Sequence, residues 1–223
     1  LEKAPDSRQG KNTQYEIADA GLGAFSVFYT QAPSFLAHQR DMQERKGKSN
    51  AQSLFEMETI PSDGQIRNLL DPIEPAQLRE PFWEIYGSLE QSGHLDQYRG
   101  VGGTYLISLD GSQSFSSQEI HCPNCRGTVR GGKTTYSHNV LEAKLVTHNG
   151  ISVSIATEWV RNENGKEYDK QDCEQQAIKR WVKRNDGRYD RYRYTFLGDD
   201  IFCSLHAKKI TLKNCKKRPS FIY

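Results

Sequence analysis

Long apolar runs are missing from this chain. No stretch approaches the ~20 consecutive apolar residues that a membrane-spanning helix needs, and the first residues, Leu1 to Pro5, lack the shape of a signal peptide. Of the 223 residues, 35% are hydrophobic and 26% are charged. We therefore expect a soluble cytoplasmic protein with a modest core, no membrane partner, and either one large domain or two small ones.

The cysteines cannot all be paired, and acidic residues are absent from the end of the chain. Five cysteines, an odd number, argue against a closed disulfide framework and favour reduced thiols, with or without a metal. Residues 201–223 carry six lysines and arginines but no Asp or Glu, so the first 200 residues hold 24 basic against 28 acidic side chains. Binding to nucleic acid would therefore depend on local basic patches rather than on whole-chain charge.

The pattern of apolar residues predicts four regions: a flexible arm over residues 1–13, a helical region over 14–99, a sheet domain over 100–203 and a basic tail over 204–223. Ser34 and Ser62 are predicted to cap helices, and Gln65 completes a capping-box pattern. A further helix over 75–93 is predicted to pack against the sheet domain through an apolar stripe of Leu78, Phe82, Ile85, Tyr86 and Leu89.

Two short predicted helices, over 49–57 and 62–70, are compatible with a helix-turn-helix. In that interpretation Lys46, Lys48 and Arg67 contact DNA phosphates. The same pattern is also common in purely structural helical bundles, so a role in DNA binding stays open at this point.

Two predicted strands each end in aspartate. Residues 104–110 read as a buried strand that delivers Asp110 to its C-terminal edge, and residues 192–198 run into Asp199 and Asp200. Carboxylates on neighbouring strands can hold a pair of divalent cations that cleave a phosphodiester. The alternative is that Asp-Gly and Asp-Asp simply form turns here, because Asp is a preferred turn residue.

The segments between these strands predict an α/β fold. Residues 136–146 and 151–155 are predicted to form an antiparallel pair joined at His148-Asn149-Gly150, an Asn-Gly hairpin turn, and with the first strand they make a three-stranded meander. A helix over 169–184 then crosses back, which places the 192–198 strand parallel to the first. Glu174 at the start of this helix is favoured by the helix dipole.

A Cys-x-x-Cys pair follows the first strand. Cys122 and Cys125 have the spacing that lets two thiolates meet one tetrahedral zinc, with His121 and His138 as candidates for the other ligands. The alternative is a pair of free thiols in a surface loop. The basic, glycine-rich segment that follows, residues 126–133, is either a contact for DNA phosphates or a solvated hairpin tip.

Several strings in this chain resemble bacterial insertion-sequence transposases with a ribonuclease-H-like DDE catalytic domain. They are LISLDGSQSFSSQEIHCPNC, GKTTYSHNVLEAKLV, KQDCEQQAIKRWVKR and TFLGDD, and upstream IPSDGQIRNLLD resembles the segment ahead of that domain. The resemblance covers roughly residues 14–203. It implies that Asp110 is the first acid of the triad and Asp200 the second, with Asp199 as the runner-up. It also implies two Mg²⁺ or Mn²⁺ ions, a bacterial cytoplasmic location, and transposon-end and target DNA as partners.

The resemblance fails at the third acid. The family's glutamate lies on a helix well beyond the second Asp, whereas this chain has no acidic residue after Asp200. We therefore expect an incomplete ribonuclease-H-like sheet in a truncated or frameshifted transposase that is catalytically impaired, and a homodimer if it is functional. The alternatives are a non-catalytic DNA-binding or zinc-binding protein and a remnant that folds poorly.

Overall fold

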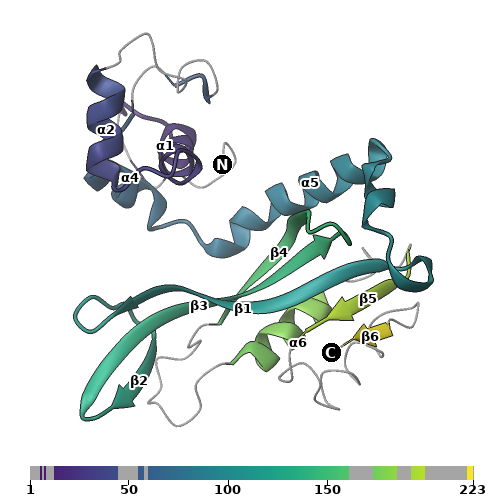
Figure 1. The fold of residues 1–223 in the computed structure, drawn as a ribbon. Coiled ribbons are helices and arrows are strands. Elements are labelled where there is room, and N and C mark those ends of the chain that lie inside the picture. The colour runs from purple at the N-terminus through teal and green to yellow at the C-terminus, as the bar shows by residue number, and fades with distance from the viewer. Residues whose placement is uncertain are drawn as a thin grey trace. The chain divides into compact units, whose positions relative to one another are not determined.

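The chain forms two compact units, Leu1–Glu80 and Pro81–Tyr223. The computed structural model describes Asp6, Arg8 and residues 13–44, 55–57, 60–160, 173–184, 192–198 and 220–222. The described part of the first unit is helical, and the second holds a mixed sheet with helices, which confirms the α/β class (Figure 1). The division lies about 20 residues before the expected boundary at 99/100, because Tyr86, Leu95 and Tyr98 are buried in the same core as the sheet.

Three helices of the first unit are described: α1 (Ile17–Tyr29), α2 (Phe35–Glu44) and α4 (Asp63–Leu70). Both expected caps are confirmed. The Ser34 hydroxyl accepts a hydrogen bond from the Ala37 N–H at 3.1 Å, and the Ser62 hydroxyl accepts one from the Gln65 N–H at 3.3 Å. Each cap satisfies a backbone donor that a helix N-terminus leaves unpaired.

A buried histidine joins α1 to α2. His38 is only 4% exposed, and its Nε2 lies 2.9 Å from the hydroxyl of Ser26, which is also buried. Its Nδ1 lies 3.3 Å from the Thr30 hydroxyl. Burial lowers the pKa of His38, although the charge of Asp41 opposes the shift. The imidazole therefore contributes to this contact in its neutral form.

Acid is expected to destabilise the first unit through His38. The unfolded chain takes up the proton more readily than the folded chain, so the stabilisation is complete above the ordinary pKa near 6.5 and is lost as the pH falls toward the lower folded-state pKa. We expect the unfolding free energy of His38→Gln, measured in urea, to fall less between pH 7 and pH 5 than that of the parent protein. His94→Gln, which changes an exposed histidine, should show the same fall in unfolding free energy between pH 7 and pH 5 as the parent protein. An equal fall in unfolding free energy for all three proteins would contradict this assignment.

Helix α5 (Glu80–Gln91) follows the 3₁₀ turn η1 (Pro75–Arg79). Tyr86 is buried and its hydroxyl lies 2.7 Å from that of Tyr194, whereas Leu78 and Ile85 are 43% and 44% exposed. The expected apolar stripe was thus wrong at these two positions. Leu78 lies in the 3₁₀ turn, which has about three residues per turn, so a 3.6-residue period does not continue through it. Ile85 lies within α5 and is rotated by about 100° around the helix axis from the buried Tyr86.

The sheet in the second unit contains β1 (Tyr105–Ser117), β2 (Arg126–Arg130), β3 (Lys133–Val146), β4 (Ser152–Val160), β5 (Tyr194–Leu197) and β6 (Ser220–Ile222). Strand β3 pairs antiparallel with β1 on one side and with β2 and β4 on the other. Strand β5 runs parallel to β1, and β6 runs parallel to β5. The expected antiparallel meander and the parallel return strand are both confirmed.

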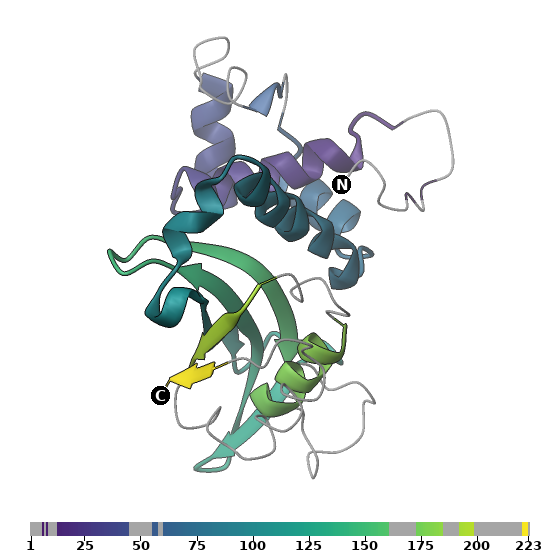
Figure 2. The same cartoon turned by 90° about the vertical axis from the view of Figure 1, so that its right-hand side faces the viewer.

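The two faces of the sheet differ. Because side chains alternate along a strand, the buried residues Ile107, Leu109 and Ala143 share one face, which helix α6 (Glu174–Arg184) covers (Figure 2). We call it the helix face. The α6 residues buried against it are Ala177, Ile178, Trp181 and Val182. The opposite side, the polar face, carries half-buried or exposed residues such as Asp110 and Glu142.

A buried carboxylate fixes α6 to the helix face. Glu158 on β4 is 4% exposed. It accepts hydrogen bonds from Arg180 Nε at 3.0 Å and from Arg184 Nη2 at 3.1 Å, while Arg184 Nη1 reaches its other oxygen. Arg180 also donates to the Trp159 carbonyl at 2.8 Å. Two guanidinium groups thus compensate one desolvated charge.

Neutralising Glu158 should loosen this contact. We expect Glu158→Gln to lower the unfolding free energy by about 3 kcal/mol, because the substitution leaves two partly buried cations without their anion. Glu142→Gln is the matched control, since Glu142 forms a more exposed ion pair with Lys144 that contributes less than about 1 kcal/mol. Urea titrations followed by circular dichroism measure both changes. Equal losses for the two variants would contradict the assignment.

Candidate metal centre

Strand β1 does not end at Asp110. It continues to Ser117, and Asp110 lies in its middle, so the expectation of a strand-end carboxylate was wrong. Five of the six residues from Ser112 to Ser117 are polar, so this part of β1 has no apolar strand pattern. Their backbone nevertheless pairs with β3 from Tyr136 to Val140, and backbone hydrogen bonds in a ladder do not require apolar side chains.

Asp110 is exposed on the polar face, just beyond the point where β1 and β5 separate. The last parallel pair described is Ser108 with Leu197, two residues before Asp110. The residue of β3 that pairs with Asp110 is Glu142. Its Oε2 lies 2.9 Å from Lys144 Nζ, and its carboxylate also accepts a hydrogen bond from the Ser154 hydroxyl. Asp199 and Asp200 lie outside the described residues, as do Lys46 and Lys48.

Glu174 lies on the other side of β1. Its carboxylate rests against Gly111 and leaves no room for a β-carbon there. Because Gly111 and Asp110 point to opposite faces of the sheet, the side chains of Glu174 and Asp110 are separated by the strand. This arrangement agrees with the expected place of Glu174 at the start of α6.

A β-bulge redirects the far half of β1. Gln113 pairs with Asn139, but Phe115 pairs with His138, so Ser114 is the extra residue. The Ser114 hydroxyl donates to the His138 carbonyl at 3.2 Å. The bulge reverses the alternation and places Phe115 on the polar face beside His138, with ring centroids 5.9 Å apart.

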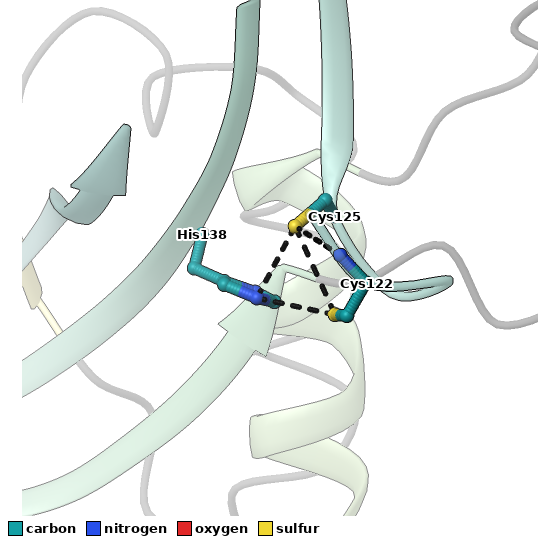
Figure 3. A group of neighbouring side chains, drawn as sticks. All are labelled: Cys122, Cys125 and His138. Carbon is teal, nitrogen blue, oxygen red and sulfur yellow. Dashed lines mark hydrogen bonds between the residues drawn. The ribbon is translucent and has the colours of Figure 1, made fainter. Parts of the chain in front are cut away.

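His138 meets two cysteines at this place. Cys125 directly precedes β2, and because Arg126 pairs with Ser137, Cys125 lies opposite His138. Cys122 is three residues earlier in the same turn, where its N–H donates to the Cys125 sulfur at 3.3 Å. All three side chains point toward one another (Figure 3). Each sulfur is 3.4 Å from His138 Nε2, and the sulfurs are 3.8 Å apart.

These separations match a tetrahedral metal. Bonds of ~2.3 Å to sulfur and ~2.05 Å to nitrogen at the tetrahedral angle place two sulfurs about 3.8 Å apart and sulfur about 3.6 Å from nitrogen. Cys122, Cys125 and His138 thus form a cluster that could hold a metal ion. The rings of Phe115 and Trp159, each 5.9 Å from the His138 ring, line its apolar side.

Burial tunes the protonation of this cluster. It raises the pKa of the Cys125 thiol and lowers the pKa of His138. His138 is therefore neutral at pH 7, which is the form that ligates a metal. The cysteine must release its proton on binding, so metal affinity rises with pH.

Two other predicted site residues do not join the cluster. His121 is stacked on Tyr136 with ring centroids 4.2 Å apart, and its Nδ1 lies 3.2 Å from the Glu119 carbonyl. Arg67 is exposed on α4 and pairs with Asp63 at 3.1 Å, one turn away. Phe115 and Trp159 carry no local sequence signal for this site, because only the bulge and the strand register bring them to His138.

No family model matches this chain, and no curated protein does. None of the helices in the described part of the chain is long and apolar enough to cross a bilayer.

The cluster predicts tight binding of one divalent metal per chain. We expect Co²⁺ to produce the visible absorption of a tetrahedral thiolate complex at one equivalent, and Cys125→Ser to abolish it, because three protein ligands become two. Cys173→Ser is the matched control, since Cys173 is a free cysteine outside the cluster. His121→Ala should bind like the parent protein. Retention of the Co²⁺ spectrum in Cys125→Ser would contradict the assignment.

Proposed function

We propose that this chain is a DNA-processing domain of the DDE transposase type, with Asp110 as its first metal-binding acid. The observation that supports the proposal is the parallel pairing of β5 with β1 after the α6 crossover. This pairing brings the C-terminal end of β5, at Leu197, close to Asp110. Ligand sites in open α/β sheets form at such carboxyl edges.

The residues around Asp110 fit a hard divalent cation. Its carboxylate is exposed and lies opposite Glu142, so a second oxygen ligand is one strand away. A bound Mg²⁺ or Mn²⁺ would activate the attacking water and stabilise the leaving oxygen. The protein contributes Asp110 as an anionic anchor, and Lys144 holds the Glu142 carboxylate in place. In this proposal Asp200 is the second acid and Asp199 its alternative.

Neither Glu158 nor Glu174 is placed to serve as the third acid of a DDE triad. Glu158 is buried against two arginines, and Glu174 is on the opposite side of β1 from Asp110. Neither side chain lies on the polar face that carries Asp110. In this proposal Glu142 takes the place of the third acid, and we expect weak hydrolysis of DNA phosphodiesters rather than efficient strand transfer, since Lys144 offsets part of the charge that would retain a second cation.

A second candidate function rests on the cysteine cluster. We propose that Cys122, Cys125 and His138 bind zinc, because two thiolates and an imidazole form a donor set that Zn²⁺ prefers. In this alternative the chain is a zinc-stabilised DNA-binding protein without catalysis.

Nicking of supercoiled plasmid tests the nuclease proposal. We expect the full chain with Mn²⁺ to nick plasmid slowly and Asp110→Asn to reduce the rate at least about 100-fold, as expected for the loss of a metal-binding group in the transition state. Glu84→Gln, an exposed change on α5, should leave the rate unchanged. A folded protein that nicks no faster than Asp110→Asn would refute the nuclease proposal and favour the zinc-binding alternative.

A further inference from the structure

The sheet continues well beyond its buried part as an exposed antiparallel ribbon. We call this part the distal ribbon; it consists of residues 112–117 of β1, all of β2, and residues 133–140 of β3. Most of its side chains are exposed or half-buried. It reaches away from β5 and β6 (Figure 1). Such a ribbon has little core of its own and is marginally stable in water unless something else holds it.

The cysteine cluster lies where this stabilisation is needed. Cys122 and Cys125 belong to the turn that enters β2, and His138 belongs to the β3 segment paired with it. A metal held by all three would cross-link the turn to the strand. Because the unfolded ribbon lacks this preformed site, the free energy of metal binding would stabilise the folded ribbon.

The tip of the distal ribbon concentrates positive charge. Gly131 and Gly132 form a two-residue turn with φ of +56° and +76°, a conformation that glycine adopts without strain, and the turn places Arg130 directly opposite Lys133. Arg126 lies at the other end of β2 and is half-buried. Between residues 112 and 140 the only acidic residue is Glu119. This basic segment contrasts with the first 200 residues as a whole, which are net acidic.

Further groups on the distal ribbon suit a nucleic-acid backbone. Exposed or half-buried hydroxyl groups that can donate to phosphate oxygens occur on all three strands, at Ser112, Ser116, Thr128, Thr134 and Thr135. His121 and Tyr136 form a stacked aromatic pair at the side of β3. Beyond Tyr136, where β1 ends, the ribbon consists of β2 and β3 alone, and the major groove of duplex DNA is wide enough to admit such a two-stranded β-ribbon.

We propose that the distal ribbon, held by the metal cluster at Cys122, Cys125 and His138, is a DNA-binding arm that contacts phosphates through Arg126, Arg130 and Lys133. This inference rests on the proposed function in DNA processing and adds the surface that binds the DNA. Binding by the ribbon requires the metal cluster but does not require Asp110.

Fluorescence anisotropy of a labelled 20-base-pair duplex with the zinc-loaded full chain tests the proposal. We expect Arg130→Gln/Lys133→Gln to weaken binding about tenfold and to reduce the slope of log K against log salt by about 2, since two phosphate contacts are lost. Lys179→Gln/Lys183→Gln removes the same charge from α6 and should leave both quantities unchanged. Equal effects of the two double variants would overturn the proposal.

Two further measurements separate the arm from the metal and from catalysis. Cys125→Ser, or zinc removal by a chelator, should weaken binding as much as the ribbon-tip variant does, and added zinc should restore binding only in the chelated parent protein. Unchanged affinity without zinc would overturn the role of the cluster. Asp110→Asn should bind DNA with the affinity of the parent protein. If the parent protein binds DNA but does not nick it, the nuclease proposal is refuted and the proposal of a DNA-binding arm is retained.

Discussion

The pairing of β1 with β3 is the constraint on which the rest of the second unit depends. It extends from Ile107 to Ser117 and decides which side chains share a face. Asp110 lies opposite Glu142, and Phe115 lies opposite His138. Both pairs lie on the polar face, and along β3 they are separated by four residues, or roughly 13 Å at the usual rise of a strand. One ladder thus positions both the candidate acid and the candidate metal ligand.

The two halves of this ladder are stabilised differently. The half near β5 buries Ile107, Leu109 and Leu145 against α6, and the buried Glu158 fixes that helix through two arginines. Beyond Asp110 the side chains are mostly exposed, so apolar burial contributes little. The cluster of Cys122, Cys125 and His138 occurs in this second half, where a metal cross-link would replace the missing core.

The bulge at Ser114 changes which face of the sheet the following residues of β1 point to. If the strand were regular through Ser114, Ser114 would pair with His138 and Phe115 would point to the helix face, so His138 would lose an apolar neighbour. The bulge lies in the part of β1 where buried and exposed side chains no longer alternate regularly. Bulges beside functional sites commonly redirect a side chain in this way, and here the redirected ring packs beside the candidate ligand His138.

The sequence by itself determined the features that depend on neighbouring residues: the caps at Ser34 and Ser62, the buried strand before Asp110, the hairpin turn through His148-Asn149-Gly150, and the Cys122 and Cys125 spacing. It also predicted the parallel return of β5, which follows from crossover handedness. Only the tertiary structure decided that β1 continues past Asp110, that His138 rather than His121 meets the cysteines, and that Glu174 lies across the strand from Asp110. A polar strand carries no local apolar pattern, because its conformation is held by backbone hydrogen bonds to a partner strand distant in the chain.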